Sequence, residues 1–222
     1  MATDLLARRD PERWLEWAIV RLDDWGFVLD SDPRLPSLPS LVVEHPLRGS
    51  WWADPEAHLI YRARSSLVAH SDVLHAVLVS GKLTCIHRRL WPSFLAVALA
   101  IEDWKLDGLS PIERAIWDRL PRGKRMTADE PGLPSTSAKA NGAAMRELES
   151  RLLCAGGNLH TARGSHAKYV TSWDAWQAEK GLPRPALSAE EGRRQLDECM
   201  DRLNREFGGR GVLPWWRATR PG

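Results

Sequence analysis

The chain contains 222 residues, of which 43% are hydrophobic and 27% charged, and its formal net charge is +2. These values are typical of a globular protein long enough for two small domains, and the apolar runs are too short to span a bilayer. The near-neutral balance excludes a protein that is basic throughout, so a polyanion partner would have to meet a local patch.

The N-terminus and the cysteines indicate the compartment. Residues 1–10 lack the apolar core of a secretion signal, and Cys85, Cys154 and Cys199 form no CxxC pair. Three widely separated thiols fit reduced, buried cysteines better than disulfides or zinc ligands. We therefore expect a cytoplasmic protein without a membrane partner.

Two helices of the N-terminal part begin where an Asp-Pro pair precedes an apolar stripe. Asp10-Pro11 predicts a helix that Gly26 closes, and Asp54-Pro55 predicts a second helix reaching about Ala69. The apolar residues 27–29 predict a short strand between them.

The next elements lead into the middle of the chain. Residues 72–80 fit either a helix or a strand, and Gly81 after an Asp-capped run favours the helix. Residues 83–87 predict a strand, and Pro92 opens an apolar helix reaching about Glu102.

Capping signals then repeat at short intervals. Ser110 to Glu113 form a capping box ahead of an apolar stripe, and Thr127 to Glu130 repeat this signature over a much shorter span. Ser137 caps a long helix, which we expect Gly156-Gly157 to end.

A hairpin follows the long helix. Residues 158–162 and 167–172 tolerate β-structure, and 163–166 join them with Gly164 supplying a positive φ. Helix, turn, helix and hairpin in this order are typical of a winged helix-turn-helix.

These elements predict an α+β, mostly helical fold. Besides the winged helix, it contains an N-terminal winged-helix-like α/β unit and an amphipathic C-terminal helix that a capping box at Ser188 begins. We expect a domain over 1–105, the winged helix over 106–180, and a C-terminal helix and tail over 181–222 that pack back on the body.

Basic residues gather in the predicted winged helix. From Leu133 to Ser172 there are five Lys or Arg residues and two acids, a local balance of +3. In a winged helix the second long helix enters a major groove and the hairpin contacts phosphate. A solvated charged face is the alternative. The predicted nucleic-acid-binding residues are Lys139, Asn141, Arg146, Arg163, His166 and Lys168.

Asn141 and the hairpin residues have distinct expected roles. Asn141 is suited to bidentate adenine recognition, and Arg163 and Lys168 flank the hairpin tip, where replacing them should weaken binding without harming the fold.

A second set mixes basic and aromatic residues in the N-terminal part. Basic side chains after the strand at 83–87 could meet phosphate or pair with nearby acids, and the loop from His45 to Trp52 resembles either a ligand pocket or a loop anchor. The members of this secondary site are His45, Trp51, His87, Arg88 and Arg89.

Motifs for familiar catalytic chemistry are missing from the sequence. No Gly-rich phosphate loop precedes a helix, no nucleophile elbow is present, and the seven histidines show no metal-ligand spacing. We therefore expect no metal and no cofactor, and we identify no catalytic residue.

A longer pattern resembles a known family. It comprises Leu78–Ala96 (LVSGKLTCIHRRLWPSFLA), Asp107–Pro111 (DGLSP) and Ala144–Leu153 (AMRELESRLL). Over residues 41–177 this arrangement is similar to bacterial relatives of the AlkZ (YcaQ) winged-helix DNA glycosylases, which unhook crosslinked or alkylated bases. The resemblance implies tandem winged-helix-like units.

The catalytic motif of those glycosylases is not found. They carry Gln-x-Gln or Gln-x-Asp, whereas this chain has only Gln177 and Gln195, neither in that context. The resemblance supplies no catalytic residue, and the sequence favours a binding protein over an enzyme.

Three functions follow as hypotheses. The first is a winged-helix DNA-binding protein linked to DNA repair, the second a divergent glycosylase-like enzyme, and the third a winged helix that binds only protein. A positive patch over helix and hairpin would favour the first, a deep polar pocket holding His45 or His87 the second, and an exposed apolar groove the third.

Overall fold

The computed structural model describes residues 10–43, 45, 47, 49–120, 125–130, 132–133, 137–160 and 166–218, with only the backbone at 158–160, 166–167 and 217–218. The protein is α+β and mostly helical, with two three-stranded sheets, which confirms the predicted fold class at that level. No helix in the described part of the chain is both long and apolar enough to cross a membrane.

The chain divides into two compact units, Met1–Trp91 with Arg194–Leu213 and Pro92–Arg193 with Pro214–Gly222. The boundary predicted after residue 105 therefore lies inside the second unit. Residues 181–222 form no unit of their own, because α10 (Ala189–Phe207) contributes to both.

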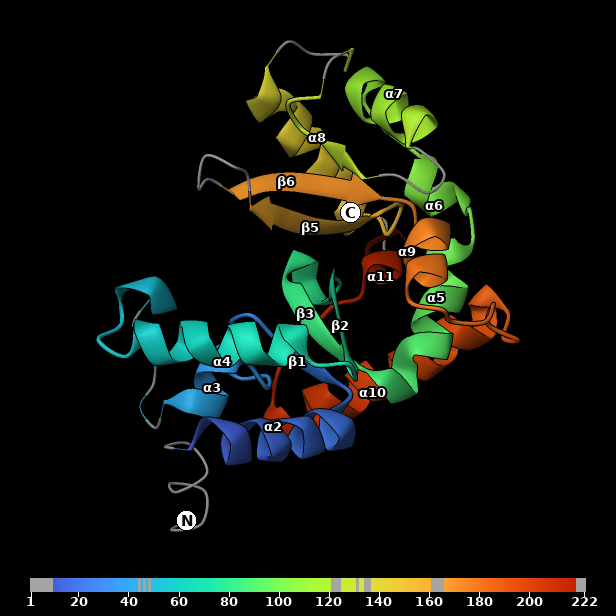
Figure 1. Cartoon of the computed structure of the whole chain (residues 1–222). Coiled ribbons are helices and arrows are strands. Elements are labelled where there is room, and N and C mark those ends of the chain that lie inside the picture. Colours follow the sequence, from blue (N-terminus) through green and yellow to red (C-terminus); the bar gives the residue numbers. More distant parts are fainter. Residues whose placement is uncertain are drawn as a thin grey trace. The chain divides into compact units, whose positions relative to one another are not determined.

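The first unit contains a three-stranded antiparallel sheet in the order β1-β3-β2. Its strands alternate along the chain with helices, as Figure 1 shows. The elements are α2 (Pro11–Trp25), β1 (Phe27–Leu29), α3 (Leu38–Val42), η1 (Trp51–Ala53), α4 (Ala57–Ala69), β2 (Val73–Val77) and β3 (Leu83–His87).

The helix predicted over residues 72–80 is wrong. Residues 73–77 form β2, and each pairs with a residue of β3, from Val73 opposite His87 to Val77 opposite Leu83. This partner strand satisfies the backbone groups that a helix would have satisfied locally, and two β-branched valines suit the pleated conformation.

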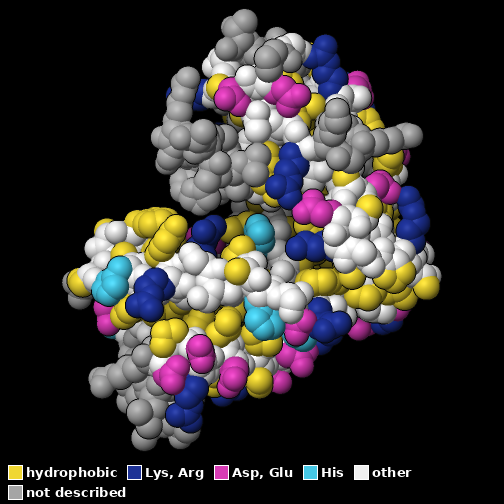
Figure 2. Space-filling model, in the orientation of Figure 1, with side chains coloured by type: hydrophobic (Ala, Val, Ile, Leu, Met, Phe, Trp, Pro, Cys, Tyr) yellow, Lys and Arg dark blue, Asp and Glu magenta, His cyan; other side chains and the backbone are white. Residues whose placement is uncertain are grey.

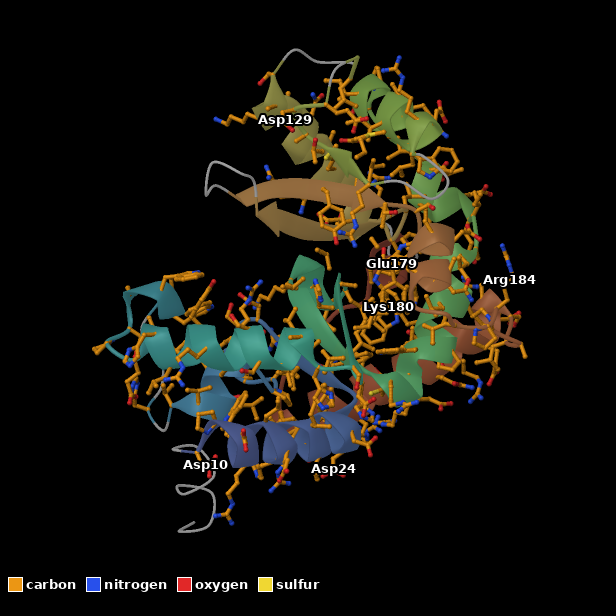
Figure 3. The ribbon with its side chains drawn as sticks, in the orientation of Figure 1. Asp10, Asp24, Asp129, Glu179, Lys180 and Arg184 are labelled. Atoms are coloured by element: carbon orange, nitrogen blue, oxygen red, sulfur yellow. The ribbon has the colours of Figure 1, made fainter. Side chains whose placement is uncertain are left out.

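The capping residues of α2 act as predicted. Asp10, at the start of the helix in Figure 3, accepts hydrogen bonds from the amides of Glu12 and Arg13. Gly26 ends the helix with a φ of 84°, and a Cβ there would lie 2.7 Å from the sulfur of Cys199. Glycine thus permits both the turn and the close approach of α10.

The second unit repeats this order. A helix precedes a first strand, a second helix follows, and a hairpin completes a sheet in the order β4-β6-β5. The elements are α5 (Trp91–Leu99, from Pro92 onwards), α6 (Asp103–Leu106), α7 (Pro111–Arg119), β4 (Met126–Thr127), α8 (Ala138–Ser150), β5 (Ala155–His160), β6 (His166–Thr171), α9 (Trp173–Glu179) and α11 (Pro214–Ala218).

The predicted hairpin is confirmed, because Leu159 pairs with Ala167 and Gly157 with Tyr169. The expectation that Gly156-Gly157 ends the long helix is wrong, since α8 ends at Ser150 and both glycines lie within β5. A Cβ at position 156 would collide with the side chain of Glu149, so the glycine makes room for that carboxylate.

Two predicted caps begin α7 and α8. Ser110 and Glu113 exchange side-chain and backbone hydrogen bonds of 2.8 and 3.3 Å, a complete capping box. The hydroxyl of Ser137 accepts a hydrogen bond from the amide of Ala140 at 3.3 Å. The apolar residues of α7, α8 and the sheet then meet in one core, which includes Ile116, Met145, Leu148 and Val170.

The three cysteines are buried and unpaired by disulfides. Burial raises the pKa of each thiol, that of Cys85 to about 12. We therefore expect Ellman's reagent at pH 8 to modify no thiol in the native protein and all three in guanidinium chloride. Rapid reaction of even one native thiol would contradict this burial.

Candidate nucleic-acid interface

The predicted recognition helix is α8, all of whose residues the structure describes. Lys139 and Arg146 are exposed, and their spacing of seven positions places them on one side of the helix. The two acids lie elsewhere: Glu147 accepts a hydrogen bond from Arg151 at 2.7 Å, and Glu149 is buried. The exposed side is therefore positive.

Asn141 does not belong to this exposed side. It is 2% exposed, and its amide nitrogen donates to the carbonyl of Ala128 at 3.1 Å. Position 141 lies on the same side of α8 as the inward-facing Ala144 and Leu148. The side chain of Asn141 therefore connects α8 to the turn after β4. The expectation that Asn141 recognises adenine from an exposed position is wrong.

Lys168 is engaged within the protein. Its ammonium forms an ion pair with Glu149, which connects β6 to α8. Burial raises the pKa of Glu149, and the bond from Lys168 opposes that rise. Lys168 thus compensates a buried carboxylate and is not the freely exposed hairpin residue expected from the sequence.

Two further residues of the predicted interface belong to the hairpin. Arg163 lies outside the described residues. His166 opposes His160 at the start of β6, but the structure describes only its backbone.

The basic cluster after β3 pairs with acids of its own unit. The buried His87 places Nδ1 2.9 Å from the carboxylate of Asp23, and Arg89 places Nε 3.2 Å from the same carboxylate. Arg88 pairs with Asp72 at 3.0 Å. Desolvation lowers the pKa of His87, partly opposed by Asp23. Of the two predicted alternatives, these contacts support pairing over phosphate binding.

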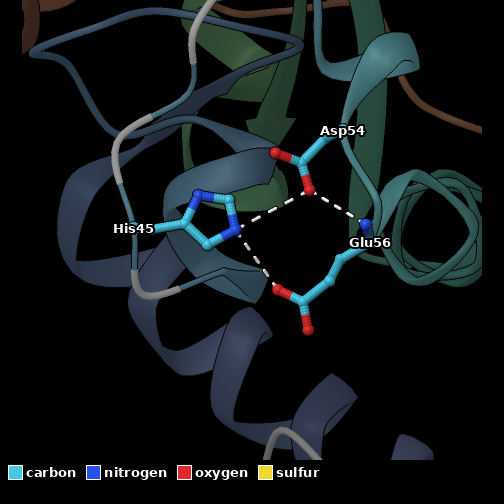
Figure 4. Close-up of side chains that lie close together, drawn as sticks. All are labelled: His45, Asp54 and Glu56. Atoms are coloured by element: carbon cyan, nitrogen blue, oxygen red, sulfur yellow. Dashed lines mark hydrogen bonds and ion pairs between the residues drawn. The ribbon is translucent and has the colours of Figure 1, made fainter.

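His45 approaches two carboxylates near the start of α4. Figure 4 shows its Nε2 between Asp54, at 3.7 Å, and Glu56, at 3.4 Å. Histidine and carboxylates can together hold a divalent cation. The carboxylate of Asp54 also accepts the amide of Glu56 at 2.9 Å, so the cluster has a structural role in the first turn of α4 without a metal.

Trp51, the last member of the predicted secondary site, is buried, but the next residue is not. Trp52 is 62% exposed and lies 5.9 Å from the ring of Tyr61, which is 44% exposed. Two adjacent tryptophans in the sequence do not by themselves indicate which ring faces solvent.

The exposed side of α4 was missed entirely at the sequence level. It carries four residues that can hydrogen-bond, and α4 contains no acid. Figure 2 shows hydrophobic, His and Lys or Arg side chains close together around the start of this helix. The sequence pattern that could have revealed these residues is their helical spacing, with offsets of three, four and seven positions from the first of them. They are His58, Tyr61, Arg62 and Ser65.

A shallow groove of 260 Å³ lies beside the same helix. Apolar side chains make most of its wall, and Arg62 is the one charged residue among those that line it, so the groove presents a hydrophobic surface with one cation. Its lining residues are Pro11, Trp14, Val42, Leu59, Arg62, Ala63 and Ser66.

Comparison of the chain with protein-family models, with curated proteins and with solved structures finds no match. Gln177, one of the two glutamines considered above, is 4% exposed and donates to the carbonyl of Pro183 at 2.6 Å. This contact assigns it a role in holding the chain after α9.

Proposed function

We propose that each unit is a winged helix and that the protein binds DNA through the exposed sides of α4 and α8. The observation that carries the proposal is the repeated order of helix, strand, helix and hairpin, with the first strand beside the last in both sheets. In winged helices the helix before the hairpin contacts the groove of the duplex.

Charge on these two helices supports the same partner. Arg62 on α4 and Lys139 and Arg146 on α8 are exposed. The acids of α8 are buried or paired, so repulsion between carboxylates and phosphates is small on this side. The resemblance to winged-helix DNA glycosylases also supports DNA as the partner and a role in DNA repair.

The expected binding is weak and sensitive to salt, because the exposed sides offer few cations. Replacing both Lys139 and Arg146 with alanine should make the slope of log affinity against log salt shallower by about two. Fluorescence anisotropy with a labelled duplex between low and physiological salt measures this slope.

A matched variant controls for the change in net charge. Lys180→Ala/Arg184→Ala also removes two exposed cations, which lie at and beyond the end of α9 (Figure 3), and it should leave the slope unchanged. An equal change in both double variants would indicate only a general charge effect and would count against α8 as the contact surface.

The groove beside α4 favours a second candidate, a winged helix that binds protein. Exposed apolar grooves of this kind accept side chains of a partner. If the parent protein shows no affinity for DNA at low salt, this candidate replaces DNA binding as the leading function.

A further inference from the structure

Two large aromatic side chains of the first unit are left in solvent next to each other. In the described part of the chain the exposed large hydrophobic residues are Val20, Trp52, Tyr61 and Ile101, and Trp52 and Tyr61 have ring centroids 5.9 Å apart. Leaving two such rings exposed together forgoes burial that each could contribute to stability, which points to a ligand that covers them.

The ring of Trp52 is supported by its buried neighbour. Its ring stacks on that of Trp51 with centroids 4.0 Å apart and an angle of 23° between the planes. Trp51 is 3% exposed, and its Nε1 donates to Oδ2 of Asp30 at 3.4 Å. Arg64 donates to the other oxygen of that carboxylate, Oδ1, at 3.0 Å. Trp51 thus supports the ring of Trp52, while most of the Trp52 side chain remains accessible to a flat partner.

A phenol hydroxyl and a guanidinium are neighbours in sequence near the start of α4. Tyr61 and Arg62 are consecutive exposed residues of α4, and the side chain of Arg62 also lines the groove beside this helix. A ligand lying on the rings would contact the phenol, and the long side chain of Arg62 could turn toward an anion that extends from this ligand along α4. A flat aromatic group joined to an anion fits these neighbours better than an aliphatic side chain does.

We propose that Trp52 and Tyr61 form a stacking platform for an unpaired nucleobase, with Arg62 contacting the adjoining phosphate. This inference rests on the proposed binding of DNA and names the form of DNA that the first unit prefers, a strand with an exposed base. Bases in a paired duplex are covered by their neighbours, whereas an unpaired base can leave the stack and lie on an aromatic ring.

The test compares three labelled DNAs of equal length: a single strand, a duplex with one bulged nucleotide and a fully paired duplex. Trp52→Ala should weaken binding of the first two about tenfold and change the third less than twofold, since stacking on one aromatic ring contributes on this order. Trp52→Phe should retain most of the affinity. Val20→Ala, which shortens an exposed apolar residue elsewhere in the unit, is the matched control.

A spectroscopic readout distinguishes stacking from a structural effect. The fluorescence of 2-aminopurine at the bulged position should be quenched by the parent protein and by Lys139→Ala/Arg146→Ala at saturation, but not by Trp52→Ala. Circular dichroism and thermal unfolding establish that the variants are folded.

The outcomes separate the two proposals. If the parent binds the paired duplex and Trp52→Ala binds all three DNAs normally, the platform is overturned and DNA binding stands. An equal loss for all three DNAs also overturns a preference for unpaired bases. If the parent binds none of them, both proposals fail.

Discussion

A Lys105→Met variant is expected to lose about 3 kcal/mol of the free energy of unfolding at pH 9, because buried carbonyls would lose their donor. Lys105 is 0% exposed. Its side-chain nitrogen donates to carbonyls where α5 ends and lies 2.7, 3.1 and 2.8 Å from the oxygens of Val97, Ala98 and Ala100. A helix leaves carbonyls at its C-terminus short of donors, and methionine offers them no hydrogen. The carbonyl of Val97 also accepts the amide of Ala100 at 3.2 Å.

The pH dependence of this loss of stability shows whether the amine of Lys105 is responsible for it. Burial lowers the pKa of Lys105 from 10.5 to about 7, although the carboxylate of Glu102 opposes the change. Between these two values the unfolded chain binds a proton that the folded protein has released, so this residue stabilises the fold increasingly as pH rises from about 7 to 10.5. The difference between parent and variant should therefore be larger at pH 9 than at pH 6.

Urea unfolding followed by circular dichroism at pH 6, 7.5 and 9 measures both effects. Lys180→Met, which replaces an exposed lysine of the same unit, should change stability by less than about 0.5 kcal/mol at each pH. Equal stability of the Lys105→Met variant and the parent at all three pH values would show that the three carbonyls do not depend on this amine.

Local signals in the sequence were sufficient for most helix starts and for the hairpin. Asp10, Ser110 and Ser137 each act on amides two or three residues away, so the cap can be recognised without knowing the rest of the fold. The division into units could not be predicted in this way. It depends on α10, which returns to the first unit from a distant part of the chain.

Non-local contacts also decided which site residues remained available. Asn141 and Lys168 have the residue types expected of a DNA contact, but Ala128 and Glu149 engage them. Conversely, Trp52 became a candidate only when its neighbour Trp51 proved to be buried. The composition of a basic segment could indicate a class of partner, whereas only the fold could show which side chains face solvent.

Lys168→Met is expected to destabilise the second unit by about 3 kcal/mol at pH 8, since it leaves the carboxylate of Glu149 buried without its partner. Glu149→Gln/Lys168→Met removes both charges and should recover most of the loss. At low temperature, where the Lys168→Met variant stays folded, its affinity for DNA should show the salt slope of the parent, because the ammonium of Lys168 is directed into the protein in the parent.

Acid should relieve the defect of the single variant. Burial raises the pKa of Glu149 above 4.5 in the folded protein, and losing Lys168 raises it further. Above pH 4.5 the folded variant then holds a proton that the unfolded chain has released, so its stability falls as pH rises through that window. Chemical unfolding at pH 5 and pH 8 should show a smaller deficit at pH 5 for Lys168→Met and no such change for the double variant. A deficit independent of pH, together with a salt slope reduced by about one, would instead restore Lys168 as a phosphate contact.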